Sequence, residues 1–356
     1  MKEESEQLLK ELTEAMGVPG CEGEVRSIIE RHLDGFCEMS RDNLGNIVCR
    51  KKGSAERPRV MLPAHMDEIG FMVKLITKEG FVRFCPLGGW WSHVVLAQRV
   101  RIYTRKGPVE GIVGSKPPHI LPKEEREKLM SIDQMFIDVG ASSQKDAEKK
   151  LGIRVGDPIV PVAPFFRMAG RRYGGKAWDD RAGIGVMIEA IKRLAKTEHP
   201  NTVYGVGTVM EEVGCRGART AAHVVEPDVC IVLEVGIAGD VPGIKPEEVQ
   251  GKLGAGPQVC VLDAGMIPNV KLRDFVLDVA EKVKINCQLF ALTGGATDGA
   301  PVHVSGAGVP TLYVGVPSRH IHSHTGIIDG RDYQDLVRLI VEVVKRLDQK
   351  TVESFR

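Results

Sequence analysis

Apolar positions in the first 35 residues repeat with the period of an amphipathic helix. The first stripe contains Leu8, Leu9, Leu12 and Met16, and the second contains Val25, Ile28, Ile29 and Leu33. Between them, the sequence Gly-Val-Pro-Gly at residues 17–20 favours a break. This pattern predicts two helices before residue 35.

In two parts of the chain, before residue 69 and after residue 169, short apolar runs occur together with longer amphipathic segments. Strands are predicted at residues 47–50, 59–64, 201–209, 228–235, 286–292 and 310–316, and helices at 180–196, 215–224, 274–283 and 330–347. Alternating strands and helices indicate an α/β fold, in which helices flank a mostly parallel sheet.

The sequence between these two parts has a different pattern. Short β-rich runs at 80–84, 99–104, 109–113 and 157–162 are separated by Gly and Pro, with one helical patch at 123–130. Such runs predict a small β-barrel or sandwich. The simplest architecture is one α/β domain built from residues 1–68 and 163–356, with residues 69–162 inserted as a β-rich domain.

Composition narrows the function classes. The 48 Lys and Arg residues balance 47 Asp and Glu residues, which leaves no positive excess for nucleic acid or an anionic membrane. No apolar run approaches the roughly 20 residues that span a bilayer, and residues 1–12 lack the pattern of a signal peptide. Eight scattered cysteines without a CxxC pair fit reduced thiols. We therefore expect a cytoplasmic protein without nucleic-acid or membrane partners.

Acidic and imidazole side chains gather where the predicted strands end. The residues concerned are His65 and Asp67, Glu211 and Glu212, Glu234, and His320, His322 and His324, while Asp179 and Asp180 open a predicted helix. Open α/β sheets bind their ligands at the carboxyl ends of the strands. We therefore expect these groups to converge, with His320 and His324 interpreted as local structure.

Each group alone also has an ordinary structural explanation. A single histidine is more often structural than a ligand, and Asp179 with Asp180 could simply cap a helix. The carboxylates of Glu211, Glu212 and Glu234 are harder to explain, because they follow or interrupt nearly uncharged strands, where a buried charge needs a partner. Together, these groups indicate a metal site.

The ligand types indicate which metal and which chemistry to expect. Two imidazoles and three carboxylates without cysteine favour zinc, cobalt or manganese over calcium or a structural zinc. A pair of ions about 3.5–4 Å apart shares a bridging carboxylate and activates a water near neutral pH. A further carboxylate must then move the proton of that water, and Glu211 beside Glu212 is placed to do so.

Six motifs occur in a fixed order along the chain. They are AHMDEIGF at 64–71, KAWDDRAG at 176–183, EEVGCRGA at 211–218, AGDVPG at 238–243, GGATDGA at 294–300 and IHS at 321–323. In these motifs the chain resembles the glutamyl/deblocking aminopeptidase family of co-catalytic metallopeptidases. That family includes the large tetrahedral aminopeptidases and proteins once labelled cellulase M, and the resemblance spans nearly the whole chain.

The resemblance implies a zinc-peptidase-like fold and a two-metal aminopeptidase that acts on short peptides. His65, Asp179 and Glu234 would hold one ion, and Asp179, Glu212 and His322 the other, so that Asp179 is the bridge. Zinc and cobalt are the metals expected. The family commonly has Asp where this chain has Glu234.

The resemblance also implies roles for residues around the ions. Glu211 would be the general base, and Asp67 would orient His65. Gly294, Gly295, Thr297 and Asp298 would line the substrate pocket. The peptide between residues 179 and 180 would be cis. The β-rich insertion would form dimers, and these would assemble into a tetrahedral dodecamer.

Three other functions stay open from the sequence. A metal-dependent deacylase or carboxypeptidase would use the same site, and the Glu at position 234 is common in such enzymes. A glycosidase would need two carboxylates but leaves His65 and His322 unexplained. A non-catalytic assembly with a decayed site would most readily have lost Glu211, which is present.

Overall fold

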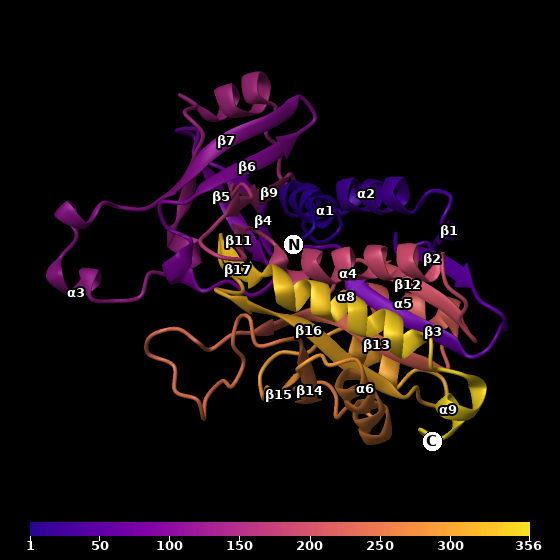
Figure 1. Cartoon of the computed structure of the whole chain (residues 1–356). Coiled ribbons are helices and arrows are strands. Elements are labelled where there is room, and N and C mark those ends of the chain that lie inside the picture. Colours follow the sequence, from indigo (N-terminus) through magenta and orange to yellow (C-terminus); the bar gives the residue numbers. More distant parts are fainter.

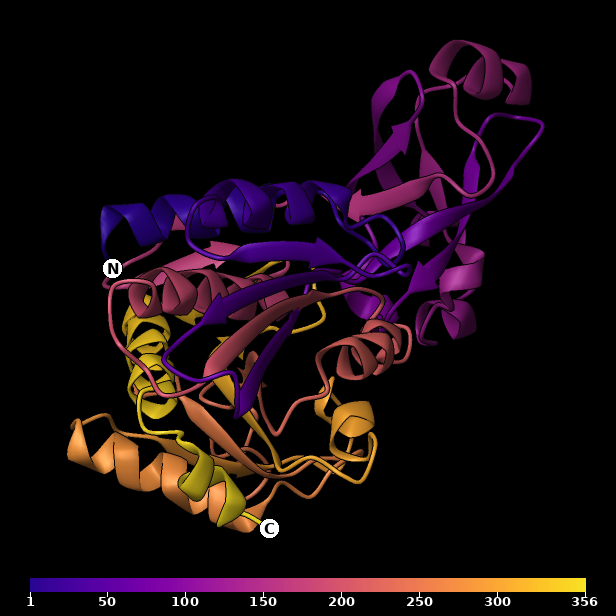
Figure 2. The ribbon, with the colours of Figure 1, turned by 90° about the vertical axis from the view of Figure 1, so that its right-hand side faces the viewer.

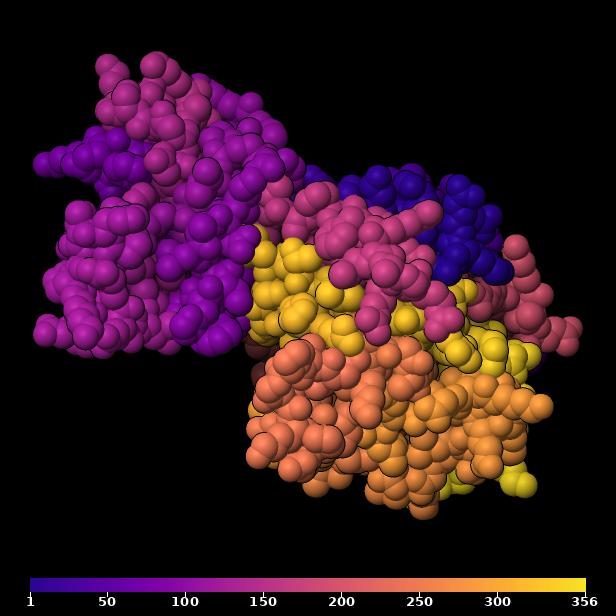
Figure 3. Space-filling model, turned by 60° about the vertical axis from the view of Figure 1, so that its left-hand side comes forward, coloured from indigo at the N-terminus to yellow at the C-terminus, as the bar shows by residue number.

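The structure is a computed structural model that describes residues 1–356, and its two parts differ in architecture. One part is a large sheet flanked by helices, and the other is a closed barrel of six strands. Figure 1 shows the barrel, in purple, projecting beyond the sheet and its helices. In the space-filling view of Figure 3 the same segment forms a separate lobe.

The sheet runs in the order β1-β2-β12-β3-β13-β16-β17-β11-β10, with β14 between β15 and β16. Its strands are β1 (Glu38–Arg41), β2 (Ile47–Lys52), β3 (Arg59–His65), β10 (Phe166–Arg167), β11 (Arg172–Gly175), β12 (Thr202–Thr208), β13 (Val229–Ile237), β14 (Gln258–Leu262), β15 (Gln288–Ala291), β16 (Thr311–Arg319) and β17 (Gly326–Asp329). The central strands β12, β3, β13 and β16 are parallel, whereas the pairs on either side of them along this order are antiparallel. Off this order, β14 is antiparallel to β16 and parallel to β15. The predicted α/β class is confirmed. The sequence pattern does not reveal β1, β10, β11, β14 or β17, since short strands carry little periodicity.

Helices cover both faces of this sheet. They are α1 (Glu3–Glu14), α2 (Gly23–Leu33), α4 (Trp178–Leu194), α5 (Arg216–Val225), α6 (Val270–Lys282), α7 (Gly299–His303), α8 (Gly330–Val344) and α9 (Gln349–Glu353). The side chains of α1, α2, α4, α6 and α8 share one large core, while α5 and α7 pack on the opposite face. Figure 2 shows strands lying between these two groups of helices. None of the helices combines the length and the apolarity that crossing a membrane would require.

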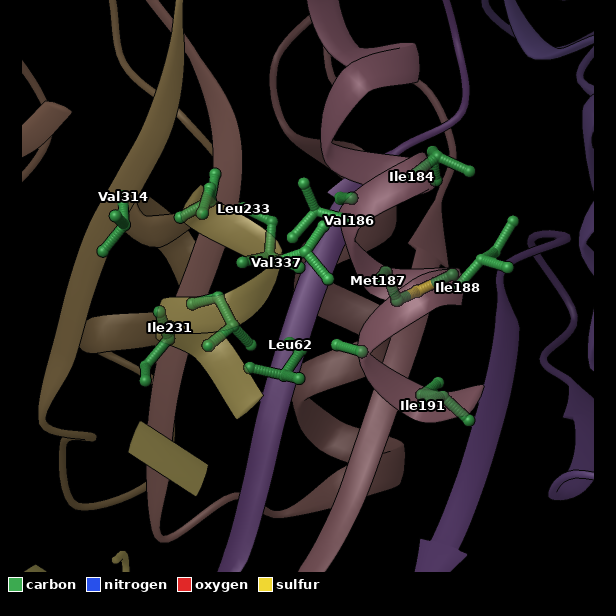
Figure 4. Close-up of a cluster of buried hydrophobic side chains, with 14 of the residues drawn as sticks. Leu62, Ile184, Val186, Met187, Ile188, Ile191, Ile231, Leu233, Val314 and Val337 are labelled. Carbon is green, nitrogen blue, oxygen red and sulfur yellow. The ribbon is translucent and has the colours of Figure 1, made fainter. Parts of the chain in front are cut away.

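Alternation along the central strands builds the two cores. On β13, Ile231 and Leu233 face the core of α4 and α8, whereas Cys230 and Val232 face that of α5 and α7. Figure 4 shows Ile231 and Leu233 beside Val337 of α8. Each such fully buried aliphatic side chain contributes roughly 1.5–3 kcal/mol to stability. This packing holds the central strands, and therefore their carboxyl ends, in one rigid register.

The barrel has its own core. Its strands are β4 (Gly70–Ile76), β5 (Val82–Leu87), β6 (Arg99–Thr104), β7 (Gly107–Gly114), β8 (Phe136–Asp138) and β9 (Pro158–Pro161), all paired antiparallel in a closed ring. Phe71 and Phe84 meet edge to face at 4.9 Å inside it. Closure removes exposed strand edges. The predicted β-rich insertion is thus a barrel, while the domain boundaries at residues 68 and 162 stay a prediction.

The helix predicted at residues 123–130 is much shorter in the structure. Only α3 (Lys123–Arg126) forms, and none of its residues is buried. Leu129, which the pattern includes in this helix, is 59% exposed. Without a surface to pack against, an amphipathic segment of this length gains too little to continue as a helix.

Candidate metal centre

The carboxyl ends of four neighbouring parallel strands form the floor of the site. His65 is the last residue of β3 and pairs in register with Thr208, the last residue of β12. Glu211 and Glu212 come three and four residues after β12 ends, and Glu234 lies in the second half of β13. His322 comes three residues after β16 ends. The structure therefore brings these side chains to one edge of the sheet.

Asp179 reaches this edge from the start of α4, where the Asp179–Asp180 peptide is cis, as the family resemblance implied. Its carboxylate contacts both imidazoles. Oδ1 lies 2.8 Å from Nε2 of His65, and Oδ2 lies 3.3 Å from Nε2 of His322. One carboxylate thus connects two histidines that are separated by more than 250 positions in the sequence.

Two groups of candidate ligands share this carboxylate. The first joins His65, Asp179 and Glu234, and the second joins Asp179, Glu212 and His322; within each group the ligand atoms lie within 4.8 Å of one another. Glu234 Oε1 is 3.5 Å from the His65 Nε2 atom, and Glu212 Oε1 is 3.4 Å from the His322 Nε2 atom. These are the two groups that the resemblance implied.

Backbone carbonyl groups hold both imidazoles from behind. His65 Nδ1 is 2.9 Å from the carbonyl oxygen of Asp67, and His322 Nδ1 is 2.8 Å from that of Gly89. Because a carbonyl oxygen only accepts hydrogen bonds, each Nδ1 donates its proton to the carbonyl, and each Nε2 is the ring atom that faces the carboxylates and is free to bind an ion. Metal-bound histidines are oriented in the same way. Gly89, between β5 and β6, makes the barrel segment part of the site, which the sequence pattern does not reveal.

The carboxylate of Asp67 has a different principal contact from the one expected. It accepts hydrogen bonds from the backbone N–H groups of Glu211 at 3.0 Å and Glu212 at 3.1 Å. Its Oδ1 is 3.6 Å from Nδ1 of His65, so the closer contact with that ring is made by the Asp67 carbonyl. Asp67 therefore positions the segment that carries both glutamates.

The pKa values and the ion pairs of these side chains indicate a site suited to cations. Burial raises the pKa of Glu212, and it raises the pKa of Glu234 to about 8. Burial lowers the pKa of His322, but the neighbouring carboxylates of Asp179 and Glu212 outweigh burial and raise it to about 11. No Lys or Arg forms an ion pair with Asp179, Glu212 or Glu234, and the buried Glu212 Oε1 has no hydrogen-bond partner. Imidazole and carboxylate ligands without a counter-charge fit divalent cations.

A cavity of about 550 Å³ opens onto these ligands. Of the residues expected in the substrate pocket, Gly294, Gly295 and Thr297 line it. Asp298 lies behind the wall, 1% exposed, and accepts a hydrogen bond from the Thr208 hydroxyl at 2.5 Å. The sequence pattern gives no signal for the apolar lining, which includes Ile237, Val249, Phe290, Leu292, Tyr313 and Ile321.

Comparison with known proteins gives the family. The family model described as M42 glutamyl aminopeptidase matches residues 45–339. The chain is 40% identical to the putative aminopeptidase FrvX of Escherichia coli (strain K12), over 98% of this chain and 97% of the relative.

Two solved structures extend the comparison. The TET aminopeptidase from the marine sediment archaeon Thaumarchaeota archaeon SCGC AB-539-E09 superposes with a TM-score of 0.97 at 50% identity, covering 99% of both chains. The TET1 peptidase of Pyrococcus horikoshii, described as assembling into a tetrahedron or a large octahedral shell, superposes with a TM-score of 0.86 at 30% identity, over 96% of this chain and 100% of that one.

These matches confirm the resemblance drawn from the six motifs. They run through every segment that supplies a candidate ligand, from β3 to the residues after β16. Members of this family are peptidases that depend on metal ions. The chain therefore belongs to the M42 glutamyl aminopeptidase family and is a metallopeptidase that hydrolyses peptide bonds.

Proposed function

We propose that this protein is a two-metal aminopeptidase that removes N-terminal residues from short peptides. The observation that carries the proposal is the Asp179 carboxylate, with one oxygen 2.8 Å from His65 and the other 3.3 Å from His322. A pair of ions about 3.5–4 Å apart requires such a shared carboxylate. His65 and Glu234 would complete one ligand set, and Glu212 and His322 the other.

Zinc or cobalt suits this mixture of imidazole and carboxylate ligands. When bound, the ion pair supplies a nucleophilic water near neutral pH and stabilises negative charge on the carbonyl oxygen. The chain itself orients the ligands, through the carbonyl groups of Asp67 and Gly89 behind the two imidazoles.

Glu211 is the proposed general base. It lines the cavity, and its Oε2 is 3.9 Å from Nε2 of His65. Glu211 also lies within 4.8 Å of ligand atoms of His65 and Glu212, but neither ion of the proposed pair needs it as a ligand, so its carboxylate is left to act on water. Burial, followed by the neighbouring carboxylates, raises the pKa of Glu211, which favours proton acceptance. Glu211 takes a proton from the attacking water and returns it to the leaving amine, while Asp67 holds the backbone of Glu211 in place.

Self-association as dimers, and further into a tetrahedral dodecamer, is part of the proposal. One structural relative assembles into a tetrahedron or an octahedral shell. The barrel segment exposes several large apolar side chains, namely Leu75, Trp91, Ile112, Ile120, Leu129 and Val155. Exposed apolar side chains of this size are typical of association surfaces. Sedimentation velocity on the purified chain tests this, since a monomer would contradict it.

A cytoplasmic location is also part of the proposal. The eight free thiols agree with this location, because thiols stay reduced in the cytoplasm.

The decisive experiment compares aminoacyl-nitroanilides with the matching N-acetylated peptides. The protein is stripped with a chelator and assayed before and after addition of zinc or cobalt. We expect cleavage to return with metal and only on substrates with a free α-amine. Metal-dependent cleavage of blocked substrates alone would instead indicate a deacylase that uses Glu234 in the same site.

A further inference from the structure

A third group of potential ligands lies beside the proposed ion pair. It consists of Glu211, Cys215 and Asp298, whose ligand atoms lie within 4.8 Å of one another. We propose that these three side chains form a separate site for a thiophilic divalent cation such as zinc or cadmium, and that its occupation inhibits the enzyme. The inhibition rests on the proposed role of Glu211, whereas the binding does not.

The backbone brings the thiol and the carboxylate together. Residues 211–215 form a single turn, in which the N–H groups of Gly214 and Cys215 both donate to the Glu211 carbonyl at 2.8 Å. Cys215 adopts a left-handed conformation with φ of 49° immediately before α5 begins. As a result, its Sγ lies 3.3 Å from Glu211 Oε1. Tetrahedral zinc places sulfur and oxygen ligands roughly 3.6 Å apart, so this pair already has close to the required spacing.

Asp298 comes from a distant segment and points independently to a cation. It is 1% exposed, and its Oδ2 accepts the Thr208 hydroxyl, but its Oδ1 has no hydrogen-bond partner. A buried acceptor left without a donor costs about 1–3 kcal/mol, and more when it is charged. Burial also raises the pKa of Asp298 to about 6, as expected for a carboxylate without a counter-charge. A bound cation would compensate this oxygen.

Access and ligand chemistry define which ion this site takes. Glu211 and Cys215 both line the substrate cavity, so an ion can enter from solvent. A sulfur ligand favours zinc or cadmium over magnesium or calcium. On binding, the S–H bond of Cys215 breaks, a bond from Sγ to the metal forms, and the proton passes to the buffer. Glu211 then serves as a ligand and no longer accepts a proton from water.

Cadmium titration of protein preloaded with two equivalents of cobalt tests the proposal. We expect a third equivalent to bind, a near-ultraviolet thiolate-to-cadmium absorption band to appear, and peptidase activity to fall in parallel. Cys215→Ser should abolish the band and raise the half-inhibitory cadmium concentration by about tenfold or more, and Asp298→Asn should also weaken binding. Cys287→Ala is the matched control, because that thiol is also partly exposed but does not line the cavity.

The outcomes separate this inference from the proposed function. If wild-type protein shows no thiolate band, or if Cys215→Ser binds the third equivalent equally well, the third site is wrong. If the band and the third equivalent appear but the preloaded protein cleaves no peptide substrate, the site stands and the aminopeptidase proposal fails. Circular dichroism of each variant confirms that it is folded.

Discussion

Asp67 and Glu68 are neighbours in the sequence, yet they lie beside two different clusters of side chains, which balance charge in different ways. The paired cluster comprises Glu68, Lys176 and Arg181. The ligand cluster comprises His65, Asp179, Glu212, Glu234 and His322. Both draw on the short segments at residues 65–68 and 176–181, and the ligand cluster adds Glu212, Glu234 and His322 from later in the chain.

The paired cluster contains its own cations. Lys176 Nζ donates to the two carboxylate oxygens of Glu68 at 2.5 and 2.7 Å, and Arg181 Nη2 lies 3.3 Å from the same carboxylate. Arg181 also donates to the backbone carbonyls of Leu12 and Met66, which joins α1, the end of β3 and α4. All three charged side chains are at most 4% exposed.

The ligand cluster contains no Lys or Arg partner for its carboxylates, only the two imidazoles. The two clusters therefore differ in where the positive charge that balances their carboxylates comes from. In the paired cluster, Lys176 and Arg181 supply the counter-charges and join backbone segments. In the ligand cluster no Lys or Arg pairs with the carboxylates, which supports the proposed binding of cations. The paired cluster thereby fixes the segments at residues 65–68 and 176–181, which carry His65 and Asp179.

The largest effect is expected on catalysis, from Glu211→Gln. An amide of the same shape cannot accept a proton, so kcat should fall by about 10²–10⁴-fold. Metal content, measured by plasma mass spectrometry, should stay unchanged, because each ion of the proposed pair has its ligands without Glu211. His65→Ala and His322→Ala are the contrasting variants and should lose metal. Full activity in Glu211→Gln would refute the assignment of the base.

The next largest effect concerns the paired cluster. Glu68→Gln leaves Lys176 and Arg181 buried without their carboxylate, and removing one partner of a buried ion pair costs about 3–5 kcal/mol. We expect this loss in the free energy of unfolding of the metal-free protein, measured by urea denaturation. A change below about 1 kcal/mol would show that the cluster does not fix the backbone as described.

Metal removal should act on the ligand cluster alone. At a free ion concentration of about 100 times Kd, each bound ion adds roughly 2.7 kcal/mol to the free energy of unfolding. Asp179→Asn should reduce this increment, since Asp179 belongs to both ligand sets. Glu68→Gln should keep it, although the starting stability is lower. Equal increments in wild type and Asp179→Asn would remove Asp179 from the metal site.

The smallest change in stability is expected from a surface ion pair, and it serves as the reference for the buried one. Glu342, in the last turn of α8, pairs with Lys345 and Arg346 just beyond the end of the helix, and the three side chains are 22%, 34% and 38% exposed. Glu342→Gln repeats the chemical change of Glu68→Gln but should alter stability by only about 0.3–0.5 kcal/mol, because solvent screens the pair. A loss of stability as large as that of Glu68→Gln would mean that burial does not explain the difference expected between the two variants.

Much of the fold follows from periodicity. The helical stripes before residue 35 correspond to α1 and α2, and the apolar runs at 59–64 and 228–235 correspond to β3 and β13. Because parallel strands end at one edge of a sheet, the convergence of the acidic and imidazole groups could also be expected. Short strands such as β14 and β17 could not, since their pattern spans too few residues.

The sequence by itself determined the fold class, the family and the set of side chains able to hold metal, because these depend on local patterns and on residues adjacent to them. Tertiary structure alone decided how those side chains are used. It directs Glu68 toward Lys176 and Asp67 toward the backbone of Glu211, brings the Gly89 carbonyl from the barrel to His322, and places Asp298 behind the cavity wall. Each of these contacts joins segments more than 80 positions apart, and no periodic pattern encodes such pairings.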